Sequence, residues 1–248
     1  MSETPAPELP WPVEDFSVYG PVEEQKLGRV QHYVGRVMQR NWTSIPHVTH
    51  HDDADITEFE QRRKAWNSAH PDRKITLLPA LVKASVAALQ SYPQFNSSLS
   101  ADGATLFRKQ YFNIGFAVDV PGGLLVPVLR DCDKKGIGEI AAEIAAISAK
   151  ARDKGLAMTE MSGGCFSLSS LGHIGGTGFT PIINAPEVAI LGITRTRGQF
   201  IPGADGKPEL RQFLPLSLSY DHRVINGADA ARFVSAIAQG LEACDFES

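Results

Sequence analysis

One histidine near the C-terminal end of the chain has the surroundings of a catalytic base. His222 follows a run of alternating apolar and small residues that predicts a strand over residues 212–220. It precedes Asn226-Gly227, a pair typical of turns. A histidine at the point where a strand breaks into a turn can present its ring at a sheet edge and move protons near neutral pH. A hydrogen-bonded structural histidine is the alternative that position alone leaves open.

The three cysteines offer no comparable site. Cys132, Cys165 and Cys244 are far apart, odd in number and without Cys-x-x-Cys or Cys/His clustering. This pattern favours neither a disulfide framework nor a zinc site, and it fits a reducing cytoplasm. We therefore expect no metal and a cytoplasmic location.

The elements that must position His222 alternate between helix and strand without a regular βαβ repeat. Apolar periodicity predicts five helices, over residues 27–41, 55–66, 77–89, 140–151 and 228–241. Strands are predicted over residues 45–50 and 212–220, in a hairpin around Pro-Gly-Gly within 113–129, and in a β-rich block over 164–193. The mixture favours an α+β fold, a two-layer sandwich, over a doubly wound sheet.

Length and charge limit the classes of function. The chain has 248 residues, of which 43% are hydrophobic, enough for one substantial core. Its net charge of −4 supplies no basic field for a nucleic acid or an anionic membrane, so neither partner is expected. Residues 1–14 are acidic and proline-rich, unlike a signal peptide, and are interpreted as a flexible tail or linker stub. Residues 15–248 are expected to form one catalytic domain.

The motif around His222 resembles a family signature. His-x-x-x-Asn-Gly is similar to the His-x-x-x-Asp-Gly motif of the chloramphenicol acetyltransferase-like superfamily, which includes the acyltransferase cores of 2-oxo acid dehydrogenase complexes such as the pyruvate dehydrogenase complex. Further segments resemble the dihydrolipoamide acetyltransferase type in the same order, from about residue 15 to about residue 241. These segments are Asn41-Trp-Thr-Ser-Ile-Pro-His-Val-Thr, Phe95-Asn-Ser-Ser-Leu, Gly163-Gly-Cys-Phe-Ser-Leu-Ser-Ser-Leu-Gly and Ile183-Asn-Ala-Pro-Glu-Val-Ala-Ile-Leu-Gly.

The resemblance implies transfer of an acetyl group between a lipoyl thiol and coenzyme A. In this scheme His222 removes the proton of the attacking thiol, and Ser169 donates a hydrogen bond to the tetrahedral oxyanion. Asn226 stands where an aspartate is common in the family, and an amide can position neighbours without adding charge. A turn residue that satisfies its own backbone is an equally good interpretation of Asn226. The sequence has no Gly-x-Ser-x-Gly segment, which disfavours an acyl-serine intermediate.

Other positions resemble coenzyme A contacts of the family. They are Arg63, Thr76, Asp119 and Ser169, with the neighbouring Ser170 as a secondary candidate. Structural alternatives remain open for each of the first three. Arg63 could be a solvated residue of a charged helix, Thr76 a helix cap, and Asp119 a turn residue.

The resemblance also implies partners. It predicts a homotrimer with active sites between subunits, served by a lipoyl group on a separate domain or chain, and association with the decarboxylase and lipoamide dehydrogenase components. Alternatives are a non-catalytic scaffold, or an acyltransferase for succinyl groups, branched-chain groups or a diffusible acceptor. Residues 240–248 are acidic, and Phe246 is interpreted as part of a frayed terminus. We therefore expect assembly to stop at the trimer, because docking interfaces need an apolar centre.

Overall fold

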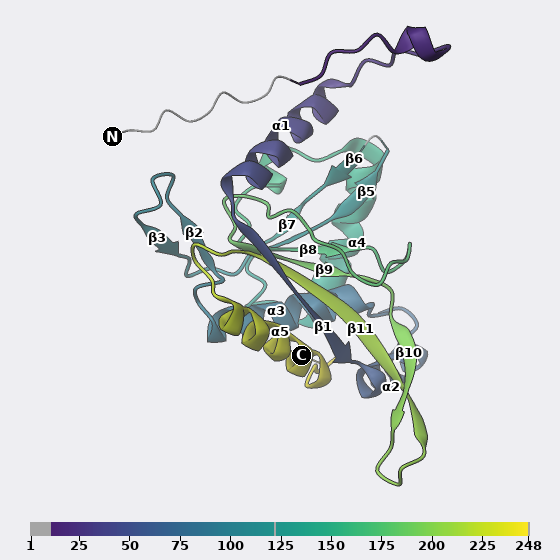
Figure 1. Cartoon of the computed structure of the whole chain (residues 1–248). Coiled ribbons are helices and arrows are strands. Elements are labelled where there is room, and N and C mark those ends of the chain that lie inside the picture. The colour runs from purple at the N-terminus through teal and green to yellow at the C-terminus, as the bar shows by residue number, and fades with distance from the viewer. Residues whose placement is uncertain (1–10, 122, 248) are drawn as a thin grey trace.

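A computed structural model describes residues 11–121 and 123–247 (Figure 1). Residues 1–10 of the predicted tail lie outside the described residues. The first described elements are a short 3₁₀ helix, η1 (Phe16–Tyr19), and helix α1 (Arg29–Ser44). In Figure 1 this N-terminal part extends away from the body of the molecule. Within the described residues, no helix is both long enough and apolar enough to cross a membrane.

The body is organised around a mixed seven-stranded sheet with the order β1-β11-β9-β8-β4-β7. The seventh strand, β10, pairs with the N-terminal part of β11. Strands β8 and β9 are parallel, as are β4 and β8, and the remaining pairs are antiparallel. The bounds are β1 (His47–Asp55), β4 (Ile114–Phe116), β7 (Val128–Leu129), β8 (Phe166–Ser170), β9 (Ala189–Ile193), β10 (Arg197–Pro202) and β11 (Pro208–Asp221).

Two small strand pairs flank this sheet. They are β2 (Ser97–Leu99) with β3 (Leu106–Arg108), and β5 (Val118–Val120) with β6 (Gly123–Leu125). The remaining helices are α2 (Thr57–Ala69), α3 (Leu77–Ser91), α4 (Ile137–Lys154), the short η2 (Met158–Glu160) and α5 (Gly227–Glu242). Helix α3 packs between α4 and α5, and α5 contacts β1 and β11, so these three helices form one layer and the sheet the other (Figure 1). This arrangement confirms the predicted α+β fold.

The core lies between these layers. Phe233 of α5 stacks on Phe95 with ring centroids 3.9 Å apart, and meets Phe166 of β8 edge-on at 5.6 Å. All three rings are completely buried. Burial of each such side chain contributes about 1.5–3 kcal/mol, so this cluster holds α5 firmly on the sheet. The loop that contains His222 therefore joins two well-anchored elements.

The predicted helices are all present, with ends shifted by a few residues. The predicted hairpin within residues 113–129 consists of two nested pairs, β5 with β6 and β4 with β7. The β-rich block was partly wrong, because residues 171–188, all of which the structure describes, form no strand. The prediction also missed β2, β3 and β10.

The interpretation of Phe246 as frayed was wrong. Its side chain is buried, and its ring centroid lies 5.6 Å from that of Phe59 and 6.2 Å from that of Trp66, both on α2. Arg62 lies over the Phe246 ring and donates hydrogen bonds to the carbonyls of Cys244 and Glu242. Carbonyls at a helix C-terminus lack partners within the helix, and Arg62 supplies them here. The end of the chain is thereby fastened to α2.

Candidate active site

His222 occupies an exposed turn between β11 and α5. The carbonyl of Asp221 accepts hydrogen bonds from the amides of Val224 and Ile225, each 3.0 Å long, which closes the turn. The His222 amide itself donates to the carbonyl of Pro46, 3.1 Å away. The imidazole is thus presented to solvent by a backbone that is hydrogen-bonded on both sides of it.

A buried carboxylate stands directly before His222. The side chain of Asp221 is 3% exposed and accepts from the amide of Arg223 at 3.0 Å and from its guanidinium at 2.7 Å. The hydrogen bond to this carboxylate raises the pKa of Arg223 above its ordinary value. Only the carboxylate of this pair is buried, because the Arg223 side chain is 46% exposed, so the guanidinium supplies a buried charge with a partner from the solvent side. The residues on either side of His222 are consequently tied to each other.

Asn226 caps helix α5. Its side-chain Oδ1 accepts from the amide of Asp229 at 2.9 Å, and its Nδ2 donates to the carboxylate of the same residue at 2.9 Å. Amides of the first turn have no partner within a helix, and Asn is among the preferred residues that supply one. Asn226 therefore fixes where α5 begins and how the turn with His222 ends.

Ser169 lies on the face of the sheet opposite the helices. Leu168 belongs to the helix-covered core, and successive side chains of a strand point to opposite faces. Ser169 therefore points away from the helices, whereas Ser170 points to the same side as Leu168. The structure separates these two predicted positions, so the pair does not form one contact surface.

Ser169 belongs to a row of small and polar residues across four strands. The register pairs Ser169 with Gly192, Gly192 with Ser217, and Ser217 with His51. A Cβ atom at position 192 would lie 2.7 Å from the ring of Phe179, so glycine is needed for that ring to rest on the sheet. Sequence reasoning missed Phe179, Ser217 and His51, because no motif marks them and only pairing across strands brings them into line.

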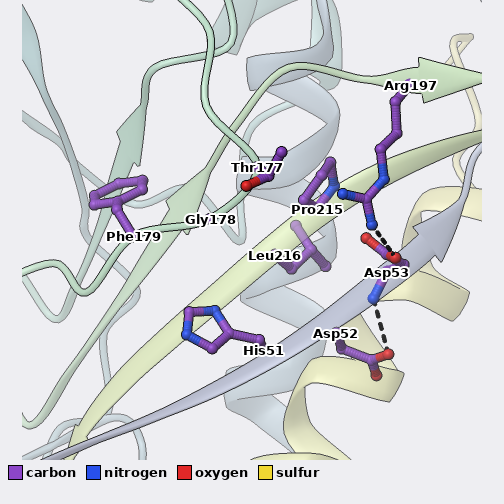
Figure 2. A pocket seen from close by; sticks show the side chains of 9 residues that line it. All are labelled: His51, Asp52, Asp53, Thr177, Gly178, Phe179, Arg197, Pro215 and Leu216. Carbon is purple, nitrogen blue, oxygen red and sulfur yellow. Dashed lines mark hydrogen bonds and ion pairs between the residues drawn. The ribbon is translucent and has the colours of Figure 1, made fainter.

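A cavity of about 570 Å³ opens at the β1 end of this row (Figure 2). The Nδ1 atom of His51 lies 2.9 Å from the hydroxyl of Ser217, and Arg197 makes a 2.5 Å ion pair with Asp53. The cavity is lined by His51, Asp52, Asp53, Thr177, Gly178, Phe179, Arg197, Pro215 and Leu216. It thus lies on the same sheet face as Ser169, with Phe179 between the two.

Besides Ser169 and Ser170 on β8, the predicted coenzyme A contacts fall into two places. Arg63 on α2 pairs with Glu60 at 2.7 Å and donates to the carbonyl of Ile75 at 3.0 Å, beside the exposed Thr76 that precedes α3. The hydrogen bond to Glu60 raises the pKa of Arg63. Thr76 stands at the N-cap position of α3 without a capping hydrogen bond from its side chain. Asp119 is exposed on β5, which Figure 1 shows at the opposite end of the molecule from α2.

A buried ionisable cluster was also missed. Glu187, just before β9, is 5% exposed, and burial raises its pKa to about 7 while the charge of Lys109 opposes that shift. Burial likewise lowers the pKa of Lys109, whose ammonium group donates to the carbonyl of Gly164 at 3.1 Å. The thiol of Cys165 lies in the same environment, and its pKa is raised by burial. A lone glutamate in an apolar stretch gave no sign that it would be buried among these groups.

The chain matches known acyltransferases along almost its entire length. Residues 19–246 match the family model described as 2-oxoacid dehydrogenases acyltransferase (catalytic domain). The dihydrolipoyllysine-residue acetyltransferase component of the pyruvate dehydrogenase complex from Cupriavidus necator is 53% identical over 94% of this chain, and that from Pseudomonas aeruginosa is 52% identical over 94%. The chain spans only 42% and 43% of those two proteins, respectively.

Solved structures agree with the sequence matches. A structure used to investigate a serine, a histidine and an asparagine in the catalytic mechanism of Azotobacter vinelandii dihydrolipoamide acetyltransferase superposes with a TM-score of 0.90. It is 49% identical and covers 94% of this chain and 96% of that one. The cubic core of a pyruvate dehydrogenase multienzyme complex superposes with a TM-score of 0.89 at 49% identity, with the same coverage of both chains. Chloramphenicol acetyltransferase, at 14% identity and a TM-score of 0.58, shares the fold.

Proposed function

Because this chain belongs to the family of 2-oxoacid dehydrogenase acyltransferase catalytic domains, we propose that it transfers an acetyl group between dihydrolipoamide and coenzyme A. The observation that carries the proposal is the presentation of His222 on a braced, exposed turn, in a chain about half identical to named acetyltransferases. The relative studied for its catalytic serine, histidine and asparagine has the last two four positions apart, as His222 and Asn226 are here.

His222 is proposed as the base of the reaction. A free thiol such as that of cysteine has an ordinary pKa of about 8.5, so at neutral pH the thiol of coenzyme A needs a base, and a neutral imidazole can accept its proton. The resulting thiolate attacks the carbonyl carbon of the acetyl thioester and forms a new C–S bond. The carbonyl electron pair moves to oxygen and gives a tetrahedral oxyanion. On collapse the old C–S bond breaks, and the departing lipoyl thiolate takes the proton back from the imidazolium.

Ser169 is proposed as the donor to that oxyanion. Ser169 is part-exposed on the sheet face away from the helices, where a substrate is proposed to meet its hydroxyl. A fixed donor of this kind typically contributes about 10²–10³ in rate, because the hydrogen bond strengthens as charge develops on oxygen. Asn226 acts through its cap on α5, which holds the turn of His222 in place.

The active site is proposed to form between two copies of the chain. Ser169 pairs near one end of β9, whereas the strand before His222 pairs near the other end, which supports a site in which the two side chains of one chain serve different carbonyls. A closed ring of copies allows this, because the histidine of each copy then faces the serine of the next. We propose that this ring is a homotrimer. The alternative is an active site formed within a single chain.

Substrates are proposed to reach this site from separate carriers. The lipoyl group is proposed to reside on another domain or chain, since the match covers the catalytic domain and less than half the length of the two curated relatives. Arg63 and Thr76, which lie side by side, are proposed to contact coenzyme A, and Asp119 and Ser170 are weaker candidates because the structure places them apart. The decarboxylase and lipoamide dehydrogenase components are proposed as further partners.

Turnover with acetyl-CoA and free dihydrolipoamide tests the proposal directly. We expect saturable formation of S-acetyldihydrolipoamide and free coenzyme A. Succinyl-CoA and a branched-chain acyl-CoA should react much more slowly under the same conditions. The absence of turnover with any of the three would favour a scaffold without activity, and a preference for another acyl group would correct the substrate.

A further inference from the structure

The turn of His222 is anchored by two segments that are remote in sequence. The amide of His222 donates to the carbonyl of Pro46, and the amide of Asp221 donates to the carbonyl of Val188 at 2.8 Å. Pro46 lies at the junction of α1 and β1, whereas Val188 lies at the end of the long loop before β9. The position of the turn therefore depends on how these two segments are held relative to each other.

His47 joins these two segments. Its Nε2 atom accepts a hydrogen bond from the amide of Ile183 at 3.0 Å, and its Nδ1 atom lies 2.8 Å from the carbonyl of Ile45. A carbonyl can only accept and a backbone amide can only donate. The two contacts therefore require hydrogen on Nδ1 and none on Nε2, so His47 is held as one neutral tautomer.

The same junction holds the other side of the Ile183 peptide. The side-chain amide of Asn41, which is 1% exposed, donates to the carbonyl of Ile183 at 2.9 Å. Ile183 is completely buried, so its peptide groups depend on protein partners. The ring of Trp42 covers the imidazole of His47, with centroids 5.3 Å apart. Asn41 and His47 thus both hydrogen-bond Ile183, five residues before Val188 in the same loop.

The charged groups Asp221 and Arg40 near His47 each have another partner. Its register partner on β11 is Asp221, whose carboxylate is bound to Arg223. On α1, the guanidinium of Arg40 donates to the side chain of Asn41. The contacts of His47 itself are hydrogen bonds to backbone and a ring contact, so its role is one of geometry.

We propose that His47 is a positioning residue for the proposed base His222, acting through the hydrogen bond that it accepts from Ile183. This inference rests on the proposed function, in which His222 removes the thiol proton. Loss of the acceptor frees the Ile183 loop, and the carbonyls of Pro46 and Val188 can then shift relative to each other. A misplacement of about 1 Å at a reacting group can lower the rate on the order of 10²-fold.

Two substitutions separate the hydrogen bond from the packing. His47→Gln retains an acceptor long enough to reach the Ile183 amide but has no ring. His47→Phe retains a ring against Trp42 but has no acceptor. We expect kcat for His47→Phe to fall roughly 10- to 100-fold, with KM for coenzyme A changed less than about twofold, and His47→Gln to stay within about threefold of the unchanged chain. The proposal would be overturned if the two variants had equal kcat values. It would also be overturned if His47→Phe kept its kcat while His47→Gln lost it.

Hydrogen exchange gives a readout that does not depend on activity. The amides of Asp221 and His222 should exchange faster in His47→Phe than in His47→Gln, because their acceptor carbonyls are less firmly held. Unchanged exchange in both variants would contradict the inference. If His47→Phe does not fold, His47→Asn serves in its place, since its side chain can reach Ile45 but is too short for Ile183.

The two proposals can fail separately. If the unchanged chain shows no transfer but the exchange rates differ as expected, the proposed function is wrong and the anchor stands. If transfer occurs, requires His222 and is as fast in His47→Phe as in the unchanged chain, the function stands and the role of His47 is wrong.

Discussion

Ser169 and His222 are held at different ends of β9. Ser169 pairs with Gly192 near the end of this strand, whereas Tyr220, two residues before His222, pairs with Ala189 at its start. Three residues of strand span about 10 Å, and the strands that carry the two residues flank β9 on opposite sides, about 10 Å apart. A base and an oxyanion donor must each lie within about 3 Å of the groups they serve, so we expect Ser169 and His222 of one chain to serve different sites.

This separation predicts complementation between inactive variants. A mixture of His222→Ala and Ser169→Ala chains should regain activity after subunits are exchanged, because some interfaces then combine an intact histidine with an intact serine. In a randomly mixed equimolar ring, about one quarter of the sites are intact. Rate measurements before and after dissociation and reassembly check this. No recovery, despite exchange shown by mass-tagged subunits, would place both groups in one chain.

His222→Ala should abolish most of the activity without unfolding the protein. The side chain is exposed, whereas the turn is held by backbone bonds and by the pair of Asp221 with Arg223. We expect kcat to fall about 10²- to 10⁴-fold, the scale of a general base. His32→Ala, an exposed histidine on α1, is the matched control and should retain activity. A folded His222→Ala variant that keeps more than about a tenth of the rate would show that another group is the base.

Ser169→Ala should lower kcat by about 10²–10³ and leave KM for coenzyme A nearly unchanged, as expected for a bond that strengthens in the transition state. Steady-state rates over a range of coenzyme A concentrations provide the test. Ser68→Ala on α2, whose hydroxyl donates to the carbonyl of Lys64 in the same helix, is the control. An increase in KM with kcat preserved would instead make Ser169 a binding residue.

Glu187→Gln should change how stability depends on pH. Burial raises the pKa of Glu187 from 4.5 to about 7, so the folded chain binds its proton more tightly than the unfolded chain does. The associated stability, on the order of 3 kcal/mol, is present below pH 4.5 and is lost as the pH rises through about 7. The glutamine variant should lack this decline and be more stable than the unchanged chain at pH 8. Denaturant unfolding at pH 5 and pH 8 measures the difference, and parallel changes in both proteins would refute it.

Light scattering after size exclusion should give a trimer of about 80 kDa, three times the 26.9 kDa of one chain. Phe246 is buried against Phe59 and Trp66 of its own chain, so it is not free to dock into another trimer. Phe246→Ala should weaken the fastening to α2 and leave the trimer intact. A particle of twenty-four or sixty subunits would show that surfaces other than Phe246 join the trimers.

Local chemistry in the sequence was enough to predict most elements and the two principal candidates. The helices follow from apolar periodicity, and α3 and α5 have the buried faces that this period requires. His222 and Ser169 lie in contiguous motifs, so the family resemblance could place them without coordinates. Residues 171–188 could not be predicted in this way, because their apolar side chains resemble those of strands although the backbone forms no ladder.

Tertiary structure alone decided which residues meet. The alignment of Ser169 with Gly192, Ser217 and His51 depends on the register of four strands, and the link from His47 to Ile183 spans 136 positions of sequence. Periodicity reports only which side of an element is apolar, and carries no information about partners that long loops bring together. The separation of Ser169 from His222 is such a property. It arises from strand order and register, and at the level of sequence only the family resemblance implied it.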